Sequence, residues 1–355
     1  MQNKKLTYFP ALDGIRGIAI LMVMVFHIFQ DSPLIRSQLL KVLDKFSIFG
    51  QTGVDLFFVL SGFLITRILL NSKPKKNYFK NFYARRSLRI FPLYYLVLVV
   101  LYILIPLFSR QDFLPISEQF WFWTYLQNVP LTFRNLSMSG PGHFWSLAIE
   151  EHFYILWPLI VYALNLRGLF ITSTAIIISA FLSRVLLFFF VGHNLFYFTL
   201  CRLDALVIGG LLALLEHKSI TLDKFQKFFG VSAILLITLL IMMWFGLSGA
   251  ESGLLQYIKY PLLATFYCLA IGYVTTLRQG STVSNKLQSG FLTYTGRISY
   301  GLYVFHPFCF EFVLDFFGLQ NFWVNSLVSF LTSYCVASLS FFLFEKTFLK
   351  LKKYF

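Results

Sequence analysis

Uninterrupted apolar runs of about 18–22 residues recur along the whole of this 355-residue chain, and they constrain its fold more than any other feature. A helix that rises about 1.5 Å per residue needs about 20 such residues to cross the hydrocarbon core of a bilayer. The runs are continuous, without the alternation of polar and apolar residues that is typical of a barrel strand. The sequence therefore predicts an all-α, polytopic membrane helix bundle.

The runs predict about ten transmembrane helices within a single domain, residues 1–355. They lie near 12–30, 52–70, 89–108, 143–163, 169–190, 200–216, 228–247, 257–277, 297–317 and 323–344. An even number of spans puts both termini on one side. If that side is cytoplasmic, twenty-one Lys and Arg residues fall in inner segments and only six in outer ones. The excess of positive charge inside favours cytoplasmic termini.

The formal net charge of +15 is explained by this sidedness, so we expect contacts with membrane lipids and no nucleic-acid partner. The four cysteines all fall in apolar runs and lack the spacing of metal ligands, so no metal site is expected. The oligomeric state stays open.

The first apolar run carries three ionisable residues, Asp13, Arg16 and His27. At about 100° per residue, Arg16 and His27 differ by about 20° around the helix axis, and Asp13 falls within about 60° of both. Ionisable groups are costly inside a membrane and usually face a cavity or a proton or substrate path. Histidine titrates near neutral pH, so His27 is a candidate general base.

The loop after the second span is the most basic segment of the chain. Arg86 and Arg89 stand three residues apart, so on a helix both guanidinium groups could converge on one phosphate-rich ligand. Arg85 adjoins them. Attraction to anionic lipid headgroups explains the same charges equally well, and the spacing alone leaves both interpretations open.

The fourth span carries a second polar stripe. It consists of His143, Ser146, Glu150, Tyr154 and Trp157. Glu151 lies about 80° from this direction, so helical geometry favours Glu150 as the inward carboxylate. The alternative is a structural ion pair between Glu150 and Arg16 or Arg202.

Three other spans carry polar residues at mid-membrane or near the outer surface. Ser61 and Gly62 form a small pair that would let a helix or a ligand approach closely. Arg202 and Asp204 are expected to form a local charge pair.

The ninth span aligns Ser299, Tyr303 and His306 on one face. A membrane histidine is often only a hydrogen-bonding packing residue, and that reading competes with a functional one for His306.

Together these motifs resemble the acyltransferase-3 family of integral membrane acyltransferases, which modify sugars and other hydroxyl-bearing acceptors in bacteria. The resemblance rests on their order along nearly the whole chain: LDGIRG with Arg16 and His27, FFVLSG with Ser61 and Gly62, the Arg86 and Arg89 pair, HFWSLAIEEHFY with Glu150, RLDAL with Asp204, and SYGLYVFHP with Tyr300 and His306.

The resemblance implies that His27 is catalytic, that Arg16 is its essential companion, and that Arg86 and Arg89 contact the phosphates of the acyl donor. It also implies the bacterial cytoplasmic (inner) membrane, and a family form without a fused esterase-like domain. Residue by residue, the catalytic candidates are His27, Arg16, Glu150 and Asp13, and the donor-binding candidates are Arg85, Arg86 and Arg89. The acceptor-binding candidates are Ser61, His143, Trp145, Ser146, Tyr154, Arg202, Asp204, Tyr300, Tyr303 and His306.

The expected function is O-acyl transfer, most simply of acetyl, from cytoplasmic acyl-CoA to a hydroxyl of a cell-surface glycan such as lipopolysaccharide O-antigen or exopolysaccharide. Acyl-CoA is a co-substrate here, and no bound cofactor is expected. Glu150 could orient the His27 imidazole as the third member of a triad does. An acyl-enzyme route through His27 or Ser61 stays open. The competing functions are a proton-coupled transporter or flippase, and an acyltransferase acting on a small molecule such as a macrolide.

Overall fold

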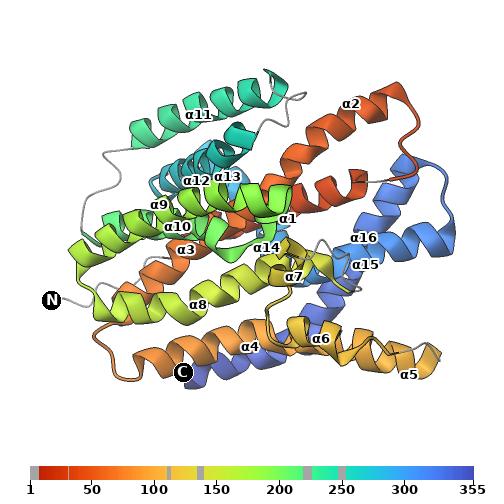
Figure 1. Ribbon diagram of the computed structural model, residues 1–355, viewed down its shortest axis with the longest axis horizontal. Helices are drawn as coiled ribbons and strands as arrows, with labels where there is room; N and C mark the ends of the chain where they lie inside the picture. Colours follow the sequence, from red (N-terminus) through yellow and green to blue (C-terminus); the bar gives the residue numbers. More distant parts are fainter. Residues whose placement is uncertain (1–7, 31, 110–112, 134–139, 219–225, 247–252) are drawn as a thin grey trace. The chain divides into compact units, whose positions relative to one another are not determined.

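The computed structural model describes residues 8–30, 32–109, 113–133, 140–218, 226–246 and 253–355. Every regular element in these ranges is helical, which confirms the all-α prediction (Figure 1). The main α-helices are α1 (Pro10–Phe29), α2 (Gln38–Ser47), α3 (Gly53–Ser72), α4 (Tyr78–Val99), α5 (Ile105–Ser109), α6 (Ile116–Trp123), α7 (Asn128–Phe133), α8 (Trp145–Ala163), α9 (Leu166–Val191), α10 (Leu203–His217), α11 (Gln226–Gly246), α12 (Gly253–Thr275), α13 (Thr282–Leu287), α14 (Gly290–Arg297), α15 (Ser299–Phe317), α16 (Phe322–Ser340) and α17 (Lys346–Lys350).

Nine of the ten predicted spans fall largely on one of these α-helices, whereas the span predicted near 89–108 runs from α4 through a π-turn, Val100–Leu104, into α5. By length and hydropathy, six helical stretches of the described residues qualify as membrane spans: Ala11–Phe29, Gln38–Ser72, Tyr78–Ser109, Leu166–Phe190, Tyr257–Thr275 and Phe322–Tyr354. These stretches indicate that the chain is an integral membrane protein. The count of ten crossings and the cytoplasmic termini stay predictions.

The chain divides into two compact units. The first unit comprises Phe58–Tyr83 and Tyr94–Thr276, and the second comprises Tyr8–Phe57, Ala84–Leu93 and Leu277–Phe355. Because the boundaries fall inside α3 and α4, each of these helices contributes residues to both units.

In the second unit, α1 packs along α14 and also contacts α13 and α15, while α15 and α16 lie side by side (Figure 1). Glycines make the approach of α1 possible. A Cβ added at Gly14 would collide with the carbonyl oxygen of Leu287, and one added at Gly296 would collide with that of Asp13. Gly14 of LDGIRG and Gly296 of α14 therefore let the backbone of α1 touch its neighbours.

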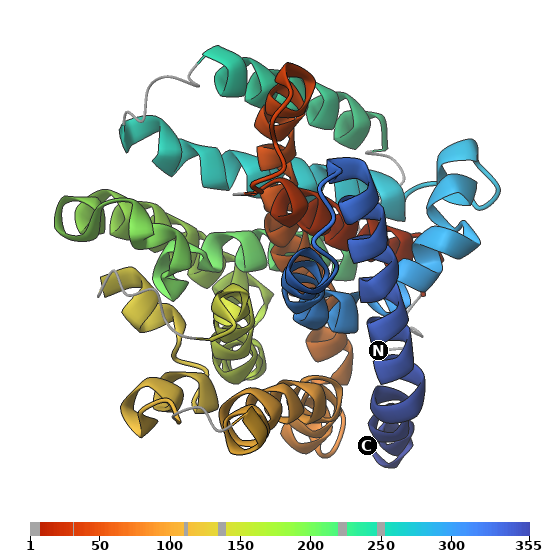
Figure 2. The same ribbon diagram turned by 90° about the vertical axis from the view of Figure 1, so that its right-hand side faces the viewer.

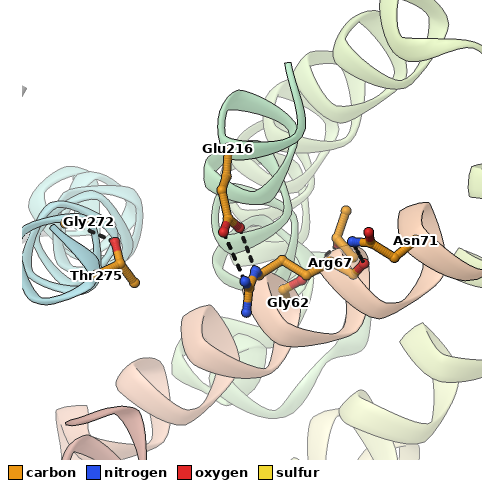
Figure 3. Close-up of polar contacts among 7 residues, drawn as sticks. Gly62, Arg67, Asn71, Glu216, Gly272 and Thr275 are labelled. Atoms are coloured by element: carbon orange, nitrogen blue, oxygen red, sulfur yellow. Dashed lines mark hydrogen bonds and ion pairs between the residues drawn. The ribbon is translucent and has the colours of Figure 1, made fainter. Parts of the chain in front are cut away.

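In the first unit, α10 packs on α9 and α12, and α11 lies beside α12 (Figure 2). Gly62 of α3 lies against the backbone of α10, because a Cβ there would collide with the carbonyl oxygen of Leu206. The small residue thus serves helix packing. One turn further along, Arg67 of α3 forms a two-pronged ion pair with Glu216 of α10, with Nη2 and Oε1 2.8 Å apart (Figure 3).

Candidate functional site

The polar residues of α1 are joined at its beginning. Nη1 of Arg16 donates to Oδ1 of Asp13 at 2.6 Å, and the Tyr8 hydroxyl donates to the other carboxylate oxygen of Asp13. That hydrogen bond, together with burial and the charge of Asp13, raises the pKa of Tyr8. Arg16 is thus held in place by a carboxylate of its own helix.

A cavity of about 200 Å³ opens beside this pair within the second unit. Its cationic lining comes from three elements: Arg16 of α1, Arg89 of α4 and Arg297 of α14. The acidic lining consists of Asp13 and Glu345. The volume is below the range of about 300–1,000 Å³ typical of a pocket that encloses a whole drug-sized ligand. The cavity therefore suits one charged portion of a larger molecule.

Positive charge accumulates around this cavity. Arg86 and Arg89 of α4 both repel the charge of Arg16, and Lys352 is repelled by Arg16 and by all three arginines in this part of α4. Arg86 is half-buried, whereas Arg85 is exposed and its Nε donates to the backbone oxygen of Phe355 at 2.9 Å. Of the three predicted donor-binding arginines, Arg89 is the one that lines the cavity. An anion there would relieve the mutual repulsion.

Glu345 enters the cavity from a π-turn that follows α16, Phe341–Glu345, and such turns are frequent at functional sites. The carboxylate accepts a hydrogen bond from Ser340 at 3.1 Å, and the residue is buried. It lies directly against Gly301, where a Cβ would be 3.1 Å from Oε1. The glycine of SYGLY thereby leaves room for the carboxylate.

At the other end of α1, His27 meets His306 of α15. Nδ1 of His27 is 3.0 Å from Nε2 of His306, and the ring centroids are 4.9 Å apart. His306 is completely buried, whereas His27 is half-buried. Local sequence spacing could not predict this partner of His306, because the contact joins residues 279 positions apart.

The other residues of the predicted ninth span also lie inside the second unit. Ser299 and Tyr303 are buried, as their shared face with His306 predicts. The Tyr303 ring lies 6.1 Å from that of His306. Tyr300 lines the cavity, and its hydroxyl donates to the carbonyl oxygen of Ile90 at 2.7 Å. Tyr300 thus fixes the turn of α4 that carries Arg89.

The polar stripe of α8 lies in the first unit. There Tyr154 donates to Oε2 of Glu150 at 3.0 Å and also bonds the hydroxyl of Ser61. Helical geometry favoured Glu150 as the carboxylate that faces the protein interior. In the structure Glu151 is the more deeply buried of the two, and Glu150 is only half-buried. Glu150 and His27 belong to different units, so orientation of the imidazole by Glu150 stays a prediction.

Three further candidates at the start of α8 have packing contacts. Ser146 and Trp145 are buried, and the Trp145 ring lies 4.6 Å from that of Phe196. His143 is half-buried, with its ring 4.7 Å from that of Phe144. A role for these residues toward an acceptor stays a prediction.

The expected pair between Arg202 and Asp204 is wrong. Asp204 instead pairs with Arg184 of α9 at 2.8 Å, and both side chains are almost completely buried. The Arg202 guanidinium lies over aromatic rings, 4.4 Å from the Tyr260 centroid and 4.9 Å from that of Phe196. Asp204 therefore takes its cationic partner from another helix, and Arg202 is attracted to the faces of aromatic rings.

A model of a known protein family matches nearly the whole sequence. The family model described as an acyltransferase domain, Acyl_transf_3, matches residues 9–344. The chain belongs to the acyltransferase-3 family.

Similar proteins come from Staphylococcus aureus. This acyltransferase-3 chain is 28% identical over 338 residues to proteins named "Putative O-acetyltransferase" in strains COL and N315, covering 88% of the chain and 52% of theirs. It is 27% identical over 320 residues to O-acetyltransferase OatA of strain NCTC 8325, covering 84% and 50%. The chain spans about half the length of the curated relatives it matches. Comparison with solved structures gave no significant match.

Sequence reasoning missed four residues at the cavity of this acyltransferase-3 chain or beside it: Tyr8, Arg297, Glu345 and Lys352. Glu345 carried a weak signal, since an acidic residue directly follows the predicted span 323–344, and acidic residues within spans point to functional sites. Arg297 lies two residues before the SYGLYVFHP motif, but its charge also fits the excess of basic residues on the inner side. Lys352 and Tyr8 lie outside the motifs and carried no such signal.

Proposed function

We propose that this chain is a membrane O-acyltransferase that moves an acetyl group from cytoplasmic acyl-CoA to a hydroxyl of a cell-surface glycan. The proposal rests on one observation above all: a single helix, α1, carries Arg16 in a cation-rich cavity at one end and His27 at the other. Family membership and the names of the relatives support acetyl transfer.

The cavity supports an acyl donor that bears phosphates. Guanidinium groups bind phosphate oxygens through paired hydrogen bonds, and Arg16, Arg89 and Arg297 approach the cavity from three helices. Its volume fits a phosphate or diphosphate portion of the donor. Asp13 holds Arg16 in position, so less conformational entropy is lost when the donor binds.

The acetyl group would then have to reach His27. Eleven residues of helix separate Arg16 from His27, or roughly 16 Å along the axis. A donor whose phosphates and thioester are joined by a long arm could bridge that distance. At His27 the imidazole takes the proton of the acceptor hydroxyl, the oxygen attacks the thioester carbonyl, and the C–S bond breaks to release the thiolate.

The test is made in cells and with purified protein. Mass spectrometry of surface polysaccharide should show acetyl groups in cells with the intact gene and none in cells with His27→Ala. Purified protein should release CoA from acetyl-CoA only when that polysaccharide, isolated from the His27→Ala cells, is added. His217→Ala, an exposed histidine at the end of α10, is the matched control and should behave like the unmodified protein.

Two outcomes would contradict the proposal. Full acetylation by His27→Ala at normal protein levels would remove the base assignment. Movement of a glycan precursor across the membrane without any CoA release would instead support a transporter or flippase.

A further inference from the structure

The two histidines of the second unit hold each other in defined protonation states. Nδ1 of His306 is 2.8 Å from the carbonyl oxygen of Leu302, and a carbonyl can only accept a hydrogen bond. Nδ1 of His306 therefore carries the proton. In a neutral imidazole the other nitrogen, Nε2, is then an acceptor.

The same reasoning fixes His27. Its Nδ1 is 3.0 Å from the carbonyl oxygen of Val23 and 3.0 Å from Nε2 of His306. Both neighbours are acceptors, so Nδ1 of His27 must be the donor. Nε2 of His27 then bears the lone pair, and no residue in the described ranges is recorded as a hydrogen-bond partner of that nitrogen.

We propose that His306 is a positioning residue: together with the Val23 carbonyl, it holds Nδ1 of His27 as the donor and so keeps Nε2 basic. This inference rests on the proposed function, in which His27 is the general base. The competing possibility is that His306 only fills space in the packing of α15 against α1.

The pair has a defined role in the reaction. The lone pair on Nε2 of His27 takes the acceptor proton, which leaves an imidazolium whose Nδ1–H still points at Nε2 of His306. The acceptor nitrogen stabilises this cation as the carboxylate of a catalytic triad does, but without a second buried charge. The proton then passes from Nε2 of His27 to the departing thiolate, which restores the neutral pair.

His306 is therefore expected to act on the chemical step more than on donor binding. Its ring contacts His27 and is not among the residues that line the arginine-rich cavity. A residue that acts only in the chemical step changes kcat and leaves KM for the donor nearly unchanged.

Three substitutions separate positioning from packing. In His306→Gln the amide oxygen reaches about as far as Nε2 and can accept from His27. His306→Asn is polar but too short, and His306→Leu has no acceptor. We expect His306→Asn and His306→Leu to lower kcat by at least about 100-fold, the lower end of the range for general acid–base catalysis. His306→Gln should stay within about tenfold, and KM for acetyl-CoA should change less than about twofold in all three. His217→Asn is the control.

Nitrogen-15 NMR of histidine-labelled protein in bilayers measures the tautomer directly and needs no activity. The His27 signals are assigned by their loss in His27→Gln. We expect a protonated Nδ1 and an unprotonated Nε2 for His27 in the unmodified protein and in His306→Gln. In His306→Asn and His306→Leu only the Val23 carbonyl still accepts from Nδ1, so the share of the other tautomer should rise measurably while staying the minor one.

An unchanged His27 tautomer in both His306→Asn and His306→Leu would overturn the inference, as would unchanged kcat in either variant. Full activity of His27→Gln would instead overturn the base assignment, and the NMR comparison would still decide whether His306 sets the tautomer of His27. Should His306→Leu fail to fold, His306→Asn and His306→Gln suffice for the comparison.

Discussion

Single residues in the second unit perform distinct electrostatic tasks. Asp13 holds Arg16, Tyr300 fixes the turn that carries Arg89, and Glu345 brings a buried carboxylate to the same cavity. The cationic residues outnumber the acidic ones in the lining, so this end of the unit favours an anionic ligand.

Arg89→Ala is expected to raise KM for acetyl-CoA about 10- to 100-fold with little change in kcat, because a hydrogen bond to a charged group is worth about 1.5–3 kcal/mol. Arg89→Lys should recover part of the loss, since it keeps the charge but not the paired donors. Steady-state kinetics of CoA release measures both. Arg278→Ala, an exposed arginine outside the cavity lining, is the control. Equal KM values for Arg89→Ala and Arg278→Ala would remove Arg89 from the donor site.

At the scale of helices, backbone contacts decide the packing. α1 meets α13 and α14 where glycines leave no side chain, and α3 meets α10 in the same way at Gly62. These contacts fix helix positions more firmly than the interdigitation of long side chains, because a side chain can change rotamer and a backbone carbonyl cannot.

Gly14→Val should lower the free energy of unfolding by about 1–3 kcal/mol or more, because the new side chain would collide with the Leu287 carbonyl. Thermal unfolding in detergent gives the comparison. Gly290→Ala, at a glycine with open space around its Cβ position, should stay close to the unmodified protein. Similar melting of Gly14→Val and Gly290→Ala would contradict the close contact of α1.

The ion pair between α3 and α10 should also stabilise the first unit. The Arg67 side chain is 7% exposed and that of Glu216 is 26% exposed, so Glu216→Ala should cost about 2 kcal/mol, between the values for exposed and buried pairs. A double-mutant cycle with Arg67→Met, measured by unfolding in SDS, should give a coupling energy of about 1 kcal/mol. Additive losses would show that the two residues do not interact.

Hydropathy predicted the helices well because span length depends on the bilayer alone. Nine of the ten predicted spans fall largely on one α-helix, and the tenth, near 89–108, continues from α4 through a π-turn into α5. Partners could not be predicted in the same way. Asp204 bonds Arg184 from another helix, and His27 bonds a residue on α15, because side-chain contacts depend on how helices pack. Local spacing therefore placed Asp13 and Arg16 close together on α1 and assigned the wrong partner to Asp204.

For the molecule as a whole, the uneven distribution of lysines and arginines between the loops predicts orientation. The loop between α3 and α4 is expected in the cytoplasm and α2 outside. In a background without the four native cysteines, Lys76→Cys should react with an impermeant thiol reagent only after the membrane is opened. Lys41→Cys should react in intact cells. Both lysines are exposed. The reverse pattern would invert the topology and move the arginine-rich cavity away from cytoplasmic acyl-CoA.

The glycine contacts at the start of α1 have a consequence for substrate choice. They anchor Arg16 against α13 and α14, and His306 holds the far end of the same rigid helix. Under the proposed function α1 then sets a constant distance, because Arg16 and His27 stay roughly 16 Å apart along the helix axis whatever molecule binds. Donors would be sorted by the reach of the arm between phosphate and thioester, before the chemistry of the acyl group mattered.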